Sequence, residues 1–103
     1  MAYRVLRTDK ANDQIRDIVL YRTAVTGRVD AGLALLDELE AGFNRLSDFP
    51  ESGSPPRYAK LRARGYRVLI AATYLAFYKV DKESERVTIY AVVDSRRDYI
   101  NLV

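Results

Sequence analysis

Residues 66–93 read YRVLIAATYLAFYKVDKESERVTIYAVV, and this stretch decides the fold. β-Branched and aromatic residues dominate three runs within it, which predicts three strands: Tyr66 to Ala71, Tyr74 to Val80 and Val87 to Val93. The polar residues 81–85 indicate a hairpin loop between the second and third strands. Residues 71–73 make a poor turn by composition, so a bulge is the alternative to a turn there. Strands that follow one another this closely are typical of an antiparallel sheet.

Two segments before this stretch show the apolar spacing of amphipathic helices, with apolar residues every three or four positions. The first helix is predicted to begin after Thr8 or Asp9, either of which can cap it, and to end at Gly27. The second is predicted to run from Val29 to about Asp48. The connection between them is short, so we expect an antiparallel hairpin that buries its two apolar stripes together or against a sheet.

The N-terminus and the connector complete the order of elements. In residues 3–7, Tyr3, Val5 and Arg7 alternate with Arg4 and Leu6, which predicts a short opening strand. Residues 48–65 are rich in Pro, Ser, Gly and Arg, which predicts an extended connector. The order strand, helix, helix and three strands predicts a single α+β domain over residues 1–103. We expect its two-helix hairpin to pack on one face of a mainly antiparallel sheet.

The composition excludes several kinds of chemistry. The sequence contains no cysteine and no histidine, so disulfides, thiolate nucleophiles, zinc-finger ligand sets and Ser-His triads are excluded. It also lacks carboxylate clusters with metal-site spacing and Gly-rich phosphate loops, so we expect no metal and no cofactor. No apolar run reaches the ~18–20 residues of a membrane helix, and the start MAYRVLRTDK does not resemble a secretion signal. We therefore expect a cytoplasmic protein with no membrane partner.

Positive charge gathers in one part of the chain. The sequence has 17 Lys and Arg against 14 Asp and Glu, a net charge of +3. Six basic residues and no acidic one lie between Ser52 and Val80, so the rest of the chain is net negative. A patch of this kind attracts a phosphate backbone or an acidic protein segment, more weakly as salt rises. The alternative is a solvated loop whose charges only keep the protein soluble.

Two candidate binding positions lie in this basic part. In the connector, Tyr58 is surrounded by basic side chains that can hold phosphates while the ring stacks on a base: Arg57, Lys60, Arg62 and Arg64. The alternative is a solvated loop with Tyr58 and Leu61 packed on the core. Arg67 stands in an otherwise apolar strand, either for a functional reason or as a cross-strand partner of a carboxylate with a packed aliphatic stem.

A third candidate lies where the last strand ends. Arg96 and Arg97 stand near Tyr99, and two guanidiniums beside a phenol can brace a pentavalent phosphate. The alternative is a local salt-bridge cluster of the two arginines with Asp94 and Asp98. Arginine stays protonated at neutral pH, so a ribonuclease built here needs another general base, which leaves Lys60, a tyrosinate, Asp94 or Asp98.

Four short motifs, in this order and spacing, resemble the RelE/ParE superfamily of bacterial toxins: Gly65 to Leu69, Tyr74 to Val80, Val87 to Tyr90 and Arg96 to Tyr99. The resemblance extends over nearly the whole chain. It implies the toxin of a type II toxin-antitoxin system, held inactive by a cognate antitoxin that folds around it. The N-terminal part of such an antitoxin often binds operator DNA, so operator DNA is implied as a partner only through the antitoxin.

The superfamily contains two known activities. RelE-type members cleave messenger RNA on the ribosome without a metal, and this resemblance implies catalytic roles for Arg67, Arg96 and Tyr99. One departure is that Leu75 stands where RelE-type members carry an arginine, and a second is that Leu69 stands where another basic residue is common. ParE-type members, which poison DNA gyrase, commonly have an apolar residue at the position of Leu75. The absence of these two basic residues favours the ParE-like branch, because one missing transition-state contact typically lowers the rate of catalysis by about 10²–10³.

We therefore expect a toxin that inhibits growth by poisoning DNA gyrase, with five target-binding or nucleic-acid-binding residues: Arg57, Lys60, Arg62, Arg64 and Arg97. The first alternative is a ribosome-dependent messenger RNA endonuclease. The second is an inactive, toxin-derived module that only binds its antitoxin. For the antitoxin we expect an acidic and apolar segment that covers the helical hairpin or an exposed sheet edge. We also expect the arginines of the second half of the chain to converge on one surface.

Overall fold

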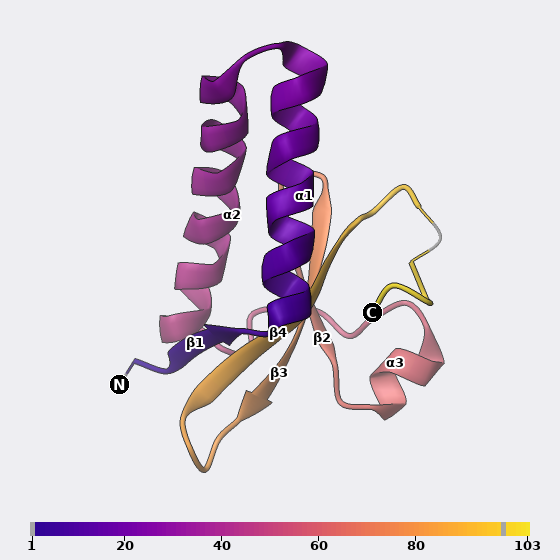
Figure 1. Cartoon of the computed structure of the whole chain (residues 1–103). Helices are drawn as coiled ribbons and strands as arrows, with labels where there is room; N and C mark the ends of the chain where they lie inside the picture. The colour runs from indigo at the N-terminus through magenta and orange to yellow at the C-terminus, as the bar shows by residue number, and fades with distance from the viewer. Residues whose placement is uncertain (1, 98) are drawn as a thin grey trace.

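The computed structural model describes residues 2–97 and 99–103, in which a four-stranded sheet lies against a helical hairpin (Figure 1). The expectation for Asp98 lies outside the described residues. In chain order the elements are β1 (Arg4–Arg7), α1 (Asp9–Thr26), α2 (Val29–Asp48), α3 (Ala59–Ala63), β2 (Arg67–Ala71), β3 (Tyr74–Asp81) and β4 (Arg86–Asp94). The strand order is β1-β4-β3-β2, with β1 parallel to β4 and the other two pairs antiparallel. The predicted α+β fold is confirmed.

The two long helices begin and end close to the predicted residues. The side chain of Thr8 accepts a hydrogen bond from the backbone N–H of Ala11 at 3.1 Å and so caps α1. Gly27 ends α1 with a φ of 69°, a left-handed conformation that glycine adopts readily. The helices then approach closely at Gly32, where a Cβ atom would meet the hydroxyl of Thr23 and the carbonyl of Val19. A side chain at this position would therefore require the Thr23 side chain to move and would press on the backbone of Val19.

The β2–β3 hairpin closes with a two-residue turn, not a bulge. Ala71 pairs with Tyr74, which leaves Ala72 and Thr73 in the turn. Ala72 has a φ of 53°, in the region that favours Gly, Asn and Asp. The composition did not indicate this turn because alanine is an unusual residue in that conformation.

The bulge lies instead between β3 and β4. Phe77 pairs with Ala91 and Tyr78 pairs with Ile89, so Tyr90 is the extra residue in β4. Ala91 belongs to the core on the face away from α1 and α2, and the ring of Tyr90 lies on that same face against Tyr66. The bulge therefore directs two consecutive side chains of β4 away from the helical hairpin.

The connector is not extended throughout, which corrects the prediction for residues 48–65. It contains the short helix α3, in which Leu61 is buried and packs under the sheet. Before α3, the backbone of Ser54 exchanges two hydrogen bonds with Val68 at the outer edge of β2, at 2.9 and 2.8 Å. One apolar residue was too little periodicity for a helix to be predicted here.

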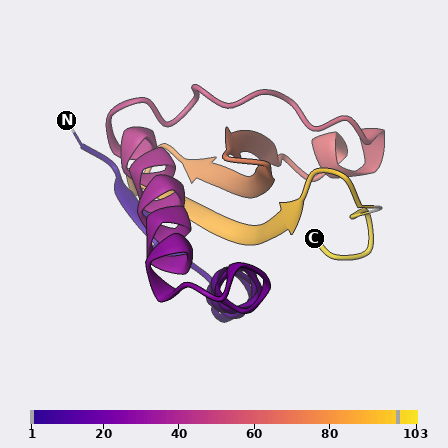
Figure 2. The ribbon, with the colours of Figure 1, turned by 90° about the horizontal axis from the view of Figure 1, so that it is seen from above.

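Apolar side chains pack on both faces of the sheet. The larger core lies between the helices and the sheet and includes Ile15, Leu39, Leu46, Tyr78 and Ile89. The smaller core lies on the second face, the one away from α1 and α2, and its buried members are Leu61, Phe77, Ala91, Val93 and Tyr99. From the end of α2 the connector passes along the outer edge of β2, where Ser54 pairs with Val68, and then reaches α3, whose Leu61 belongs to the smaller core (Figure 2). Packing of α1 and α2 on one face is confirmed.

The tip of the hairpin extends beyond the sheet (Figure 1). Four apolar side chains there are more than half exposed, with exposed fractions of 59% for Leu20, 65% for Val25, 67% for Val29 and 52% for Leu33. The prediction that both apolar stripes are buried therefore applies only to the half of the hairpin next to the sheet. The tip is an apolar surface that nothing in the described residues covers.

Candidate functional site

An open groove lies beside the C-terminal end of β4, between that strand, α1 and the segment 99–103. Its volume is about 580 Å³. The walls combine apolar side chains such as Ile18 and Val92 with the polar groups of Tyr21, Arg96 and Arg97. A groove with apolar walls and a few polar groups is the usual form of a binding site.

Arg96 is fixed at the mouth of the groove by Asp94. The Nε and Nη2 atoms of Arg96 donate to the two carboxylate oxygens of Asp94 at 3.0 and 2.8 Å, and the backbone N–H of Arg96 donates to Oδ1 at 2.9 Å. The side chain of Arg96 is 75% exposed and that of Asp94 is 19% exposed. The hydrogen bonds from Arg96, with a smaller contribution from the charge of Arg97, lower the pKa of Asp94 to about 2. The predicted contact of Arg96 with Asp94 is therefore present, and Arg96 remains accessible to a partner.

Gln14 joins α1 to the end of β4 and to the C-terminal segment. Its Oε1 atom accepts from the backbone N–H of Val92 at 2.8 Å, and its Nε2 atom donates to the carbonyl of Leu102 at 3.1 Å. β1 pairs only with Arg86–Ile89, so the amide of Gln14 takes the place of a strand partner farther along β4. Sequence reasoning missed this residue because a single polar side chain on a helix gives no periodic signal.

Tyr99 is separated from the groove. Its ring is 5% exposed and lies in the core of the second face, with ring centroids 5.3 Å from Tyr58 and 5.4 Å from Phe77. Tyr99 is not among the residues that line the groove beside Arg96. The structure thus places Tyr99 as an aromatic core residue under α3.

Arg67 holds the connector against the sheet. Its Nη2 atom donates to the carbonyls of Glu51 and Gly53 at 2.6 and 2.7 Å. The hydroxyl of Tyr78, which pairs with Arg67 across the strands, accepts from the backbone N–H of Gly53 at 2.9 Å. Within the described residues the Nε atom of Arg67 is buried and makes no hydrogen bond. Arg67 therefore faces the same side of the sheet as the helices, away from Tyr99.

The basic connector residues Arg57, Lys60, Arg62 and Arg64 are all exposed. Arg62 donates to the carbonyls of Pro56 and Arg57, both at 2.7 Å, and so fixes the chain that enters α3. Arg57 lies over the ring of Tyr58, 5.1 Å from its centroid, and donates to the Tyr58 hydroxyl at 3.1 Å. This part of the chain is a charged surface around α3, distinct from the groove that contains Arg96 and Arg97.

The basic residues therefore lie in three places and do not converge on one surface. Arg96 and Arg97 line the groove, Arg67 is on the helix side of the sheet, and the connector residues surround α3. The expectation of a single arginine cluster is wrong. Its physical reason is that successive strand residues alternate between faces, so arginines from several elements share a face only when their registers agree.

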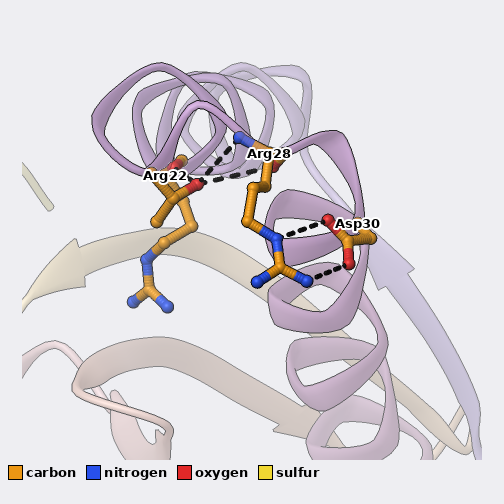
Figure 3. Close-up of polar contacts among 4 residues, drawn as sticks. Arg22, Arg28 and Asp30 are labelled. Carbon is orange, nitrogen blue, oxygen red and sulfur yellow. Dashed lines mark hydrogen bonds and ion pairs between the residues drawn. The ribbon is translucent and has the colours of Figure 1, made fainter.

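Polar contacts close the hairpin at its tip (Figure 3). Arg28 donates to both carboxylate oxygens of Asp30, at 3.2 and 2.7 Å. The hydroxyl of Thr26 donates to the carbonyl of Arg22 at 2.7 Å and accepts from the backbone N–H of Arg28 at 3.2 Å. The hydrogen bond with Asp30 raises the pKa of Arg28, which therefore stays charged at the tip. An ion pair between Arg28 and Asp30 thus stands at the tip of the hairpin.

Residues 2–97 and 99–103 contain no cluster of Asp, Glu, His or Cys able to hold a metal ion. In the same residues no helix is long and apolar enough to cross a membrane.

Comparisons with known proteins identify the family. The family model for the ParE toxin of the type II toxin-antitoxin system parDE matches residues 5–99. The structure resembles the chromosomal ParDE toxin-antitoxin system of P. aeruginosa with a TM-score of 0.73, at 15% identity, covering 90% of this chain and 96% of that chain. It also resembles the toxin-antitoxin complex RelBE2 of Mycobacterium tuberculosis with a TM-score of 0.62, at 23% identity, covering 91% and 99%. A comparison with curated proteins finds no match. Because the family model spans nearly the whole chain, the protein belongs to the ParE family of toxins of type II toxin-antitoxin systems.

Proposed function

We propose that this toxin inhibits growth in the cytoplasm by poisoning DNA gyrase and contacts its target through Arg96 and Arg97. The observation that carries the proposal is the dispersal of the residues expected for RNA cleavage. Arg67 is bound to the connector, Tyr99 is buried in the second core and Arg96 lies in the groove. A general acid-base mechanism requires such groups around one reacting phosphate. Their separation supports the ParE-like activity over the RelE-like activity.

A DNA cleavage assay tests this proposal directly. Purified gyrase, supercoiled plasmid and the toxin are incubated, the proteins are denatured and digested, and linear DNA is measured. We expect linear DNA to accumulate with the toxin and to fall about tenfold or more for the double variant Arg96→Ala, Arg97→Ala, as for a binding hot spot. Lys82→Ala, which removes an exposed cation from the β3–β4 loop, is the control and retains activity.

The other two activities give different results in a parallel translation assay. If the toxin cuts messenger RNA on ribosomes and produces no linear DNA, its activity is ribosome-dependent RNA cleavage and the proposal of gyrase poisoning is wrong. Harmless expression with neither product would identify an inactive module that only binds an antitoxin. The variant Leu75→Arg restores the arginine of RelE-type toxins, and we expect no RNA cleavage from it because Arg67 and Tyr99 remain apart.

We also propose that a cognate antitoxin covers the exposed tip of the helical hairpin. The two similar structures are both toxin-antitoxin systems, and the tip carries four exposed apolar side chains beside the ion pair of Arg28 and Asp30. An apolar segment fits this surface. Leu33→Asp should keep toxicity and lose neutralisation in a co-expression assay, because it places a charge in the apolar contact. Ala34→Asp, an exposed neighbour with the same added charge, is the control and stays neutralised.

A further inference from the structure

A cluster of two tyrosines and one lysine lies on the second face of the sheet, outside the groove and the hairpin. Tyr66 immediately precedes β2, Lys79 belongs to β3 and Tyr90 is the extra residue of the bulge in β4. The two rings are perpendicular, with centroids 5.6 Å apart. The Nζ atom of Lys79 lies 4.5 Å from the centroid of Tyr66 and 5.2 Å from that of Tyr90. All three residues are half-buried, so each presents part of its side chain to solvent.

Further cations flank this cluster. Arg64 is exposed and stands two residues before Tyr66. Arg4 pairs with Arg86 in the parallel ladder, and alternation along β4 puts that pair on the same face as Thr88, the cross-strand partner of Lys79. The charge of Arg86 is partly compensated by Asp81 at 3.9 Å. Lys79 thus contacts both rings, Arg4 lies on the same face of the sheet, and Arg64 is close to Tyr66 in the sequence.

We propose that this face binds single-stranded nucleic acid, with bases stacked on Tyr66 and Tyr90 and phosphates held by Lys79, Arg64 and Arg4. A sheet face that combines aromatic rings with flanking cations is the usual platform for unpaired bases. In the free protein the ammonium group of Lys79 lies over the two rings. When a base stacks on a ring, this ammonium group turns to a phosphate, because stacking of a base contributes more free energy than an exposed cation–π contact. The bases of a duplex are already stacked and cannot reach the rings. The proposal does not depend on gyrase as the target.

Fluorescence anisotropy of the full-length protein with labelled oligouridine and oligodeoxythymidine of about 12 nucleotides tests the proposal. We expect binding at low salt, with a slope of log K against log salt near −2 for about three phosphate contacts. Tyr90→Leu and Lys79→Gln should each weaken binding about fivefold or more. Tyr90→Phe keeps the ring and should bind like the parent, which separates stacking from a fold defect. The controls are Phe49→Leu, which removes an exposed ring after α2, and Lys10→Gln, which removes an exposed charge from α1.

Comparison of oligouridine with oligodeoxythymidine distinguishes single-stranded RNA from single-stranded DNA as the ligand. Equal binding supports contacts with bases and phosphates alone, and tighter binding of oligouridine supports RNA. The proposal is overturned if neither oligonucleotide binds, if duplex DNA binds as tightly, or if Lys10→Gln and Lys79→Gln weaken binding equally. Capture of a labelled oligoglutamate peptide by the same residues, in place of the oligonucleotides, would assign the face to an acidic protein partner instead.

Discussion

Gln14 and Val92 are joined across the groove by a hydrogen bond of 2.8 Å between a helix side chain and a strand backbone. Val92 is buried, and its backbone N–H donates its hydrogen bond to the side chain of Gln14 and not to a neighbouring strand. This hydrogen bond helps to tie α1 to the part of β4 that β1 does not reach. It also sets the wall of the groove on which Arg96 and Arg97 lie.

Replacing Gln14 should therefore destabilise the protein. For Gln14→Leu we expect a loss of about 1–3 kcal/mol in the free energy of unfolding, because a buried donor is left without a partner. Urea denaturation followed by circular dichroism measures the loss. Asn12→Leu, an exposed position of the same helix, is the control and should change the free energy by less than about 0.5 kcal/mol. Equal effects at the two positions would contradict the role assigned to Gln14.

Arg67 and Tyr78 should act together, because both hold residues 51–53 on the sheet. We expect Arg67→Met and Tyr78→Phe each to lower the free energy of unfolding by about 1–2 kcal/mol. The double variant should lose less than the sum of the two, with a coupling of about 0.5 kcal/mol or more. A double-mutant cycle by urea denaturation measures this coupling. Strict additivity would show that the two side chains hold the connector independently.

Tyr99 should matter for stability through its ring and not through its hydroxyl. Tyr99→Ala removes a buried ring between Tyr58 and Phe77, and we expect a loss of about 3–5 kcal/mol. Tyr99→Phe keeps the ring, and we expect it to keep both the fold and the toxicity. Thermal denaturation and a growth assay measure the two properties. A folded Tyr99→Phe protein that is no longer toxic would give the phenol a chemical role.

The contact between Asp94 and Arg96 should depend on pH only in acid. The pKa of Asp94 is lowered to about 2 in the folded protein, below the ~3.9 of an unfolded chain. The contact therefore contributes its full stability above about pH 5 and loses it as the pH falls toward 2. Because Arg96 is exposed, we expect a contribution of at most about 1 kcal/mol.

The comparison of Asp94→Asn with the parent protein measures this dependence. The difference in their free energies of unfolding should be constant from about pH 5 to pH 7 and should vanish near pH 2. An NMR titration of the Asp94 carboxyl group provides an independent value. A midpoint near 4 would show that Arg96 does not hold the carboxylate in solution.

Periodicity and turn chemistry were enough to predict the two long helices, the boundaries of all four strands to within one residue and the α+β order of elements. Thr8 and Gly27 mark α1 because capping is a local property of the sequence. The turn at Ala72, the bulge at Tyr90 and the helix around Leu61 were not predictable, because they depend on pairing and burial by distant residues. Burial by distant residues also explains why the predicted site was only partly correct. The sequence identified Arg96 and Tyr99 as neighbours, but the core of the second face takes Tyr99 away from the groove.

β1 is the first strand of the chain, yet its partner is the last, and the two run parallel. During synthesis the N-terminal segment must therefore wait until residues 86–89 have emerged before it can pair. Such non-local pairing slows folding. The nascent chain thus completes its sheet only after the strand that leads to Arg96 and Arg97 has been made.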